Sequence, residues 1–170
     1  MPKPVDYDLG QISAHVITYS DRVQRGTKED RATPECVGAL TAAGLGQVTM
    51  AAIPESADIL ETEIRDALEA GARFVLVLGG SGFGVGNYAP EVVRSLIAVE
   101  IPGIAEQIRA HGLTNTPLSG LSREVVGVTA RDSSGALIIS SPGSRGGALD
   151  TLEVVTPLLA AIFHQLDEQR

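Results

Sequence analysis

Residues 74–87 read FVLVLGGSGFGVGN, an unbroken apolar run followed by a loop rich in glycine. The run Phe74–Leu78 is typical of a strand buried on both faces, as in a parallel sheet. Five of the eight residues from Gly79 to Gly86 are glycine, so the backbone can approach a ligand and its N–H groups can hold an anion. Ligands of open α/β sheets bind at the carboxyl ends of the strands. The segment therefore predicts an anion site at this edge, with a tight turn that needs glycine only for its conformation as the alternative.

The glycine-rich loop does not match the common nucleotide-binding motifs. The Gly-Lys-Ser/Thr ending of a Walker A loop is absent from the sequence. The dinucleotide pattern G-x-G-x-x-G, started at Gly80 or Gly82, places Val85 or Asn87 where the third glycine is needed. The loop also follows the third predicted strand rather than the first. These mismatches predict that the loop binds an anion without either of these two motifs.

Strands and helices alternate along the chain. Ser56 is predicted to be a helix N-cap, Pro90 to occupy the first position of a helix, and Pro157 to kink or split the last helix. Strands are expected at 15–20, 48–53, 74–78 and 137–140, helices at 33–43, 57–70, 91–99, 103–110 and 148–166, and loops at 21–31 and 113–134. This alternation predicts a three-layer α/β/α fold with a mostly parallel sheet.

A second strand-to-helix turn resembles the first in composition. Residues 141–147, Ser-Pro-Gly-Ser-Arg-Gly-Gly, follow the last predicted strand and precede the last helix. Parallel strands place both turns on one edge of the sheet, and each turn precedes a helix N-terminus, which favours bound anions. The two turns together predict a ligand that carries phosphate.

Size and charge limit the classes of function. The 170 residues predict one domain over residues 12–170, after a flexible tail at residues 1–11. The tail lacks the apolar core of a signal peptide, and we expect no membrane span because no run approaches the roughly 20 apolar residues required. A net charge of −8 and an aromatic content of 4% argue against nucleic-acid binding.

The cysteine and the histidines indicate no protein-built metal centre. Cys36 is the single cysteine, which excludes an internal disulfide and fits a reducing cytoplasm. We expect Cys36 to be a buried small apolar residue, with a role as a nucleophile as the alternative. His15, His111 and His164 lack the spacing of zinc ligands.

Several short motifs, in this order, resemble the molybdenum-cofactor biosynthesis family of the MogA/MoaB type, the molybdopterin adenylyltransferases. The resemblance extends over roughly residues 13–165. Its pieces are Thr18-Tyr-Ser-Asp-Arg22, Ile53-Pro-Glu55, Gly79-Gly-Ser-Gly82 with Asn87 and Pro90, Glu100-Ile-Pro-Gly-Ile-Ala-Glu106, Leu121-Ser-Arg123 and Pro142-Gly-Ser144.

The resemblance implies a function, cofactors and an assembly. The family uses Mg²⁺ and ATP to transfer AMP to the terminal phosphate of molybdopterin, and it usually forms trimers. Glu55 and Asn87 stand where the family has its functional carboxylates, so the resemblance implies that they act in catalysis and approach Mg²⁺. The residues that it implies for substrate binding are Ser20, Asp21, Gly79, Gly80, Ser81, Gly82, Pro142, Gly143 and Ser144.

Two departures from the family pattern concern these carboxylates. Glu55 replaces an aspartate and keeps its charge, whereas Asn87 replaces an aspartate and loses it. The alternative function is therefore a molybdopterin-binding homologue that is weak or inactive as an enzyme. Asn87 has a further interpretation as a turn residue, and Arg22 and Arg145 as solvated charges rather than phosphate ligands. A flavodoxin-like redox or signalling module is the third alternative.

Overall fold

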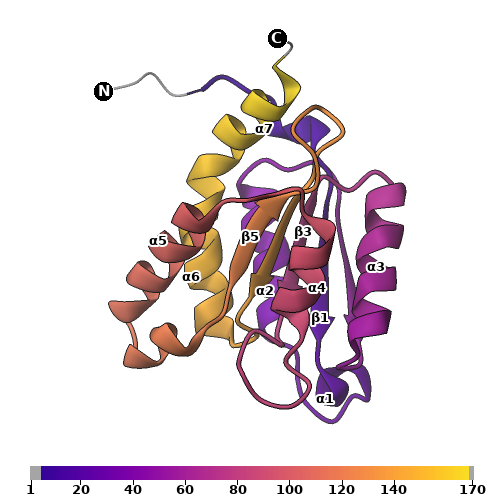
Figure 1. The fold of residues 1–170 in the computed structure, drawn as a ribbon, viewed down its shortest axis with the longest axis vertical. Coiled ribbons are helices and arrows are strands. Elements are labelled where there is room, and N and C mark those ends of the chain that lie inside the picture. Colours follow the sequence, from indigo (N-terminus) through magenta and orange to yellow (C-terminus); the bar gives the residue numbers. More distant parts are fainter. Residues whose placement is uncertain (1–4, 169–170) are drawn as a thin grey trace.

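A six-stranded mixed sheet forms the centre of the molecule, in the order β2-β1-β3-β6-β5-β4. The computed structural model describes residues 5–168, and Figure 1 shows helices on both faces of the sheet. Strands β2, β1, β3 and β6 are parallel, whereas β5 runs antiparallel to both β6 and β4. The strands are β1 (Ala14–Tyr19), β2 (Val48–Ile53), β3 (Phe74–Leu78), β4 (Val99–Glu100), β5 (Val125–Val128) and β6 (Leu137–Ser141).

The predicted helices are present, with small changes at their ends. Ser56 caps α3 by accepting a hydrogen bond from the Ile59 N–H at 3.3 Å, and Pro90 lies in the first turn of α4. Pro157 splits the last helix, as predicted, at a short 3₁₀ segment. The α-helices are α1 (Asp21–Gln24), α2 (Ala32–Ala42), α3 (Ala57–Glu69), α4 (Ala89–Leu96), α5 (Pro102–Leu113), α6 (Arg145–Val155) and α7 (Leu159–Asp167), and the 3₁₀ segments are η1 (Leu9–Gln11), η2 (Pro117–Leu121) and η3 (Thr156–Leu158).

Strand β3 is buried on both faces, which confirms the interpretation of its sequence. Phe74, Leu76 and Leu78 belong to a core cluster that includes residues of α2, α5, α6 and α7. Val75 and Val77 belong to a second cluster with residues of α3 and α4. The sheet therefore separates two apolar cores, and the fold is the three-layer α/β/α arrangement.

Some elements were wrong in the sequence prediction. Residues 113–134 were expected to be a loop, but they contain the end of α5, η2 and the whole of β5. Val99, which was predicted to end a helix, forms β4 together with Glu100, and residues 21–24, which were predicted to be a loop, form a helical turn. Residues 9–11, which were assigned to the flexible tail, form η1, while residues 1–4 lie outside the described part. Strand β5 is buried at all four positions and completes the sheet beside β6.

One helical stretch passes a simple membrane-span test. Arg145–Asp167 has the length and the mean hydropathy, 1.4, that a spanning helix requires. This stretch is the pair α6 and α7, which η3 interrupts. Its buried residues, among them Leu152, Leu159 and Phe163, belong to the core beneath the sheet.

Candidate ligand-binding site

The carboxyl ends of the parallel strands bring most of the predicted site residues to one edge of the sheet. The loop after β3 and the helical turn α1 after β1 lie at the same end of the molecule (Figure 1). The Gly79 N–H donates to the Ser141 carbonyl at 3.0 Å, which joins the loop after β3 to the end of β6. The Asp21 carboxylate accepts from the Glu55 N–H at 2.9 Å, which joins the ends of β1 and β2.

Close backbone contact explains the glycines at this edge. Gly79 has a φ of 107°, and a Cβ there would lie 2.5 Å from the Tyr19 carbonyl oxygen. A Cβ on Gly143 would lie 2.9 Å from the Cα of Gly79, so the two turns touch each other through backbone atoms. Glycine is therefore required at both positions to bring the turns together.

A pocket of about 430 Å³ lies beside the two turns. Ser81 and Gly82 line it from the loop after β3, and Pro142 and Ser144 line it from the turn after β6. The remaining lining residues come mainly from α5, η2 and the first turns of α6. Ser144 is the N-cap of α6, and its hydroxyl accepts from the Gly147 N–H at 3.2 Å. This N-terminus favours an anion in the pocket.

The other predicted residues lie outside the pocket lining. Ser20 is the N-cap of α1, where its hydroxyl accepts from the Val23 N–H at 3.3 Å. Glu55 is exposed after β2 and approaches the buried Tyr19, whose pKa is raised mainly by burial and then by the Glu55 charge. The edge thus has an acidic part at β1 and β2, and a pocket beside β3 and β6.

Asn87 has a structural role within its own loop. Its side-chain oxygen accepts from the Gly82 N–H at 3.1 Å, and its amide nitrogen donates to the Val85 carbonyl at 3.4 Å. Its backbone carbonyl accepts from Arg123. Asn87 therefore shapes the loop that lines the pocket, which agrees with its interpretation as a turn residue.

The acidic part fits the chemistry of magnesium. Mg²⁺ prefers oxygen ligands, often one or two carboxylates together with substrate phosphates. Asp21 and Glu55 offer two carboxylates at neighbouring strand ends, joined by the hydrogen bond from the Glu55 N–H. The amide oxygen of Asn87 retains one lone pair beyond the bond from Gly82.

The structural role of Arg123 was not predicted, although Leu121-Ser-Arg123 is one of the motifs that carry the family resemblance. The Arg123 Nε donates to the Gly82 carbonyl at 2.7 Å, and Nη2 donates to the Asn87 carbonyl at 2.7 Å. Its Nη1 pairs with the Glu91 carboxylate at 2.9 Å. Arg123 therefore holds the glycine-rich loop against α4.

Glu124 is a second residue that sequence reasoning missed. It lines the pocket with only 3% of its surface exposed. Its Oε2 accepts from the Thr151 hydroxyl of α6 at 2.9 Å, whereas its Oε1 has no hydrogen-bond partner among the described residues. Burial raises the pKa of Glu124 to about 8, against the opposing effects of the Thr151 hydroxyl and the Arg109 charge.

Cys36 and Arg145, which the sequence left as candidates for a nucleophile and a phosphate ligand, make other contacts in the structure. Cys36 is fully buried in the core, and burial raises the pKa of its thiol to about 12, so it is not an activated nucleophile. Arg145 pairs with Glu35 at 2.6 Å on the surface.

His111, Asp150 and Glu153 bring possible metal-ligand atoms within 4.8 Å of one another, but all three remain at least partly exposed to solvent.

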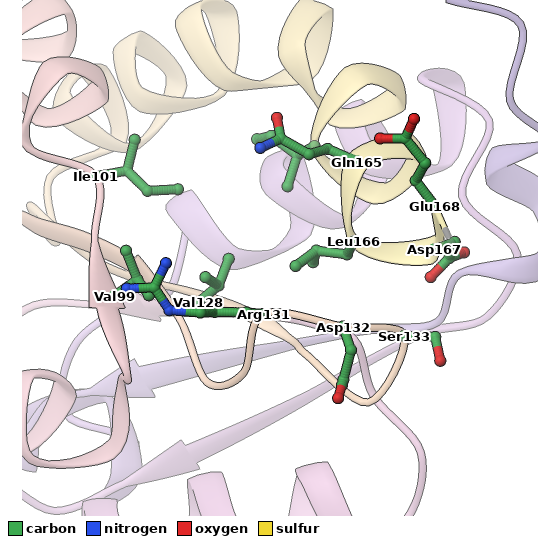
Figure 2. A pocket seen from close by; sticks show the side chains of 11 residues that line it. Val99, Ile101, Val128, Arg131, Asp132, Ser133, Gln165, Leu166, Asp167 and Glu168 are labelled. Atoms are coloured by element: carbon green, nitrogen blue, oxygen red, sulfur yellow. The ribbon is translucent and has the colours of Figure 1, made fainter. Parts of the chain in front are cut away.

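A larger cavity, of about 820 Å³, lies at the opposite edge of the sheet. Figure 2 shows Val99 and Val128 on one side and Leu166 on the other, with Arg131 and Asp132 in the loop after β5. Its strand residues lie at the edge where β6 begins, because Val128 pairs with Leu137. The cavity contains none of the predicted site residues.

A family model and sequence relatives agree on the family to which this chain is similar. A family model described as "Probable molybdopterin binding domain" matches residues 15–161. A molybdenum cofactor biosynthesis bifunctional protein of Synechococcus elongatus is 31% identical, with 89% of this chain and 46% of the relative covered. A molybdopterin adenylyltransferase of Escherichia coli K12 is 30% identical, with 86% of this chain and 75% of the relative covered.

A solved structure agrees with these sequence matches. The molybdopterin biosynthesis Mog protein of Mycobacterium ulcerans superposes with a TM-score of 0.83 at 30% identity, covering 91% of this chain and 99% of that chain. The chain spans less than half the length of the first curated relatives that it matches. The similarity therefore concerns one domain of those longer proteins.

Proposed function

The chain belongs to the family of molybdopterin binding domains, and on that premise we propose that it acts in molybdenum cofactor biosynthesis as a molybdopterin adenylyltransferase. The observation that carries the proposal is the pocket of about 430 Å³, which Ser81, Gly82, Pro142 and Ser144 line beside the N-terminus of α6. Relatives at about 30% identity bear the name of this activity. We also propose a cytoplasmic location, which the single cysteine supports.

The proposed reaction divides the edge of the sheet between two reactants. The pocket and the α6 N-terminus hold the pterin and its phosphate, and the acidic part near Asp21 and Glu55 receives ATP. An oxygen of the molybdopterin phosphate attacks the α-phosphorus of ATP, the bond to the β-phosphate oxygen breaks, and pyrophosphate leaves. Glu55 and Asn87, together with Asp21, would hold Mg²⁺, which would neutralise the phosphate charge.

The chain's own groups position the reactants. Backbone N–H groups of the turns 79–82 and 143–144 and the hydroxyls of Ser81 and Ser144 are the donors available for phosphate. Arg123 keeps the first turn in place through the carbonyls of Gly82 and Asn87. Positioning and charge neutralisation supply most of the catalysis in phosphoryl transfer.

The proposal is tested by incubating the protein with molybdopterin, ATP and Mg²⁺ and measuring adenylylated molybdopterin and pyrophosphate. We expect both products in equal amounts, and neither when Mg²⁺ is chelated. If molybdopterin binds but ATP is not consumed while a known adenylyltransferase is active in parallel, the transferase proposal is wrong. That result would instead support a molybdopterin-binding homologue without this activity.

A further inference from the structure

Glu124 is an unusual residue to find in the wall of a phosphate-binding pocket. Three side-chain polar atoms of the described residues are buried and have no hydrogen-bond partner: Arg73 Nη2, Asp167 Oδ1 and Glu124 Oε1. The first two belong to residues that form an ion pair with each other at 2.9 Å. Only the Glu124 carboxyl combines an unsatisfied buried oxygen with a position in the pocket.

The surroundings hold the carboxyl in place but leave one oxygen unused. Thr151 donates to Oε2 at 2.9 Å, and Ser141 lies within 3.0 Å of the Thr151 hydroxyl. Among the described residues, the cation that affects this carboxyl is Arg109 of α5, and its Nη1 donates to the Glu124 backbone carbonyl at 3.2 Å rather than to the carboxyl. Leaving a buried acceptor unsatisfied costs about 1–3 kcal/mol, which a donor from a ligand would recover.

The charges around Glu124 identify the kind of ligand group. Arg123 points to the glycine-rich loop and offers no charge to the Glu124 carboxyl, and Asp150 of α6 adds a second carboxyl group to the lining of the same pocket. Phosphate is favoured instead at the α6 N-terminus near Ser144. A ligand group that brings N–H donors would satisfy the unused Glu124 Oε1 and would stabilise the ionised carboxylate.

We propose that Glu124 is a specificity-determining residue that binds the 2-amino group and the adjacent ring N–H of a pterin while the α6 N-terminus holds its phosphate. This inference rests on the proposed function and adds the recognition of the ring to it. A carboxylate matches two parallel N–H donors, and such charge-assisted bonds are strong in a buried site. A pteridine with a carbonyl at this position would face the ionised carboxylate with an acceptor and could bind only the protonated form, so we expect it to bind more weakly and without releasing a proton.

The proposed contact also predicts that pterin binding releases a proton from Glu124. Because the pKa of Glu124 is raised to about 8, the carboxyl is mainly protonated at pH 7 in the free protein. N–H donors favour the ionised form, so binding of a pterin at pH 7 releases a proton from Glu124. Affinity for the pterin consequently rises as the pH increases from 7 toward 8.

The test compares two stable probes by titration calorimetry: 6-hydroxymethylpterin monophosphate and its 2,4-dioxo analogue, the lumazine monophosphate. For the wild-type protein we expect the pterin to bind about 10- to 100-fold more tightly. Titrations at pH 7 in buffers of different ionisation enthalpy should show release of close to one proton per pterin bound. Glu124→Gln should lose both effects, whereas Glu69→Gln, on the exposed side of α3, should keep both.

Each outcome separates the inference from the proposed function. Equal binding of both phosphates by the wild type, or a pterin preference that Glu124→Gln retains, overturns the role of Glu124 and leaves pterin binding intact. If neither phosphate binds the wild type, the proposed function and this inference fail together. Because the wild-type ratio and proton release need no variant, the test stands even if Glu124→Gln does not fold.

Discussion

The Arg123 side chain holds the glycine-rich loop through four hydrogen bonds, to the carbonyls of Gly82 and Asn87 and to both oxygens of Glu91. Arg123→Ala removes all of them and leaves the two loop carbonyls to water. Hydrogen bonds to charged groups contribute roughly 1.5–3 kcal/mol each to stability, and less where solvent is close. We expect the free energy of unfolding, measured in urea, to fall by about 2 kcal/mol.

A lysine variant provides the control for geometry. Arg123→Lys keeps the charge but cannot reach Gly82, Asn87 and Glu91 with a planar fork. We expect its free energy of unfolding in urea to lie closer to that of Arg123→Ala than to that of the wild type. A wild-type free energy of unfolding in Arg123→Ala would mean that the loop does not need this residue.

The raised pKa of Glu124 predicts how the stability of the folded protein depends on pH. Its pKa is raised from 4.5 to about 8 in the folded protein, so the native state binds more protons than the unfolded chain between these values. The Glu124 contribution to stability is therefore complete below about pH 4.5 and is lost as the pH rises toward 8. Glu124→Gln should flatten this decline in thermal unfolding between pH 5 and pH 8.5, and an unchanged decline would contradict the raised pKa.

Asn87→Asp tests the missing carboxylate of the proposed reaction. The aspartate can still accept from the Gly82 N–H, and it would add a negative charge where the proposed reaction brings Mg²⁺ and the phosphates together. We expect Mg²⁺-dependent adenylylation to increase on the order of 100-fold, and Glu55→Asp to change it less because Glu55 already carries a charge. Without a gain in rate, the site differs from the family in more than this side chain.

The glycines and serines of the pocket could be predicted, but the roles of Glu124 in its wall and of Arg123 behind the glycine-rich loop could not. Gly82 and Ser144 follow recognisable strand-to-helix turns, and parallel strands place such turns on one edge. Arg123 and Glu124 precede β5, a strand that the sequence analysis placed in a loop. Whether a charged residue is buried depends on partners far along the chain, here Gly82 and Thr151.

Strand β5 was missed because little in its sequence indicates a buried strand. It has only four residues, Val125–Val128, and Gly127 interrupts its β-branched pattern. Its position is fixed by pairing with β6 on one side and β4 on the other. By contrast, β3 is a longer uninterrupted run and was placed correctly, since burial on both faces leaves a clear signal.

The contact between the two turns gives a prediction for a matched pair of glycines. A Cβ on Gly143 would meet the Cα of Gly79 at 2.9 Å and its nitrogen at 3.1 Å, and neither backbone atom can move freely. Gly143→Ala should therefore destabilise the protein by about 1–3 kcal/mol. Gly146→Ala, which has nothing within 4 Å of the new Cβ, should be neutral or slightly stabilising in the same urea titration.

The assembly of the whole molecule remains a prediction from the family resemblance. We expect a homotrimer, with a mass by light scattering about three times the 17.7 kDa of one chain. A mass near that of one chain at micromolar concentration would contradict this expectation. The measurement should be repeated in 1 M salt, because a chain with a net charge of −8 repels its copies at low ionic strength.

Strands β3 and β6 are neighbours in the sheet but lie far apart in the sequence, and this separation affects how the pocket forms during folding. Phe74 pairs with Leu137, so a long loop must close before the two strands meet, and closure over such a span is slow. The turns at Gly79 and Gly143 come into contact only after this closure, so the pocket between them does not exist in a partly folded chain. A bound pterin phosphate should consequently slow unfolding and leave the refolding rate unchanged.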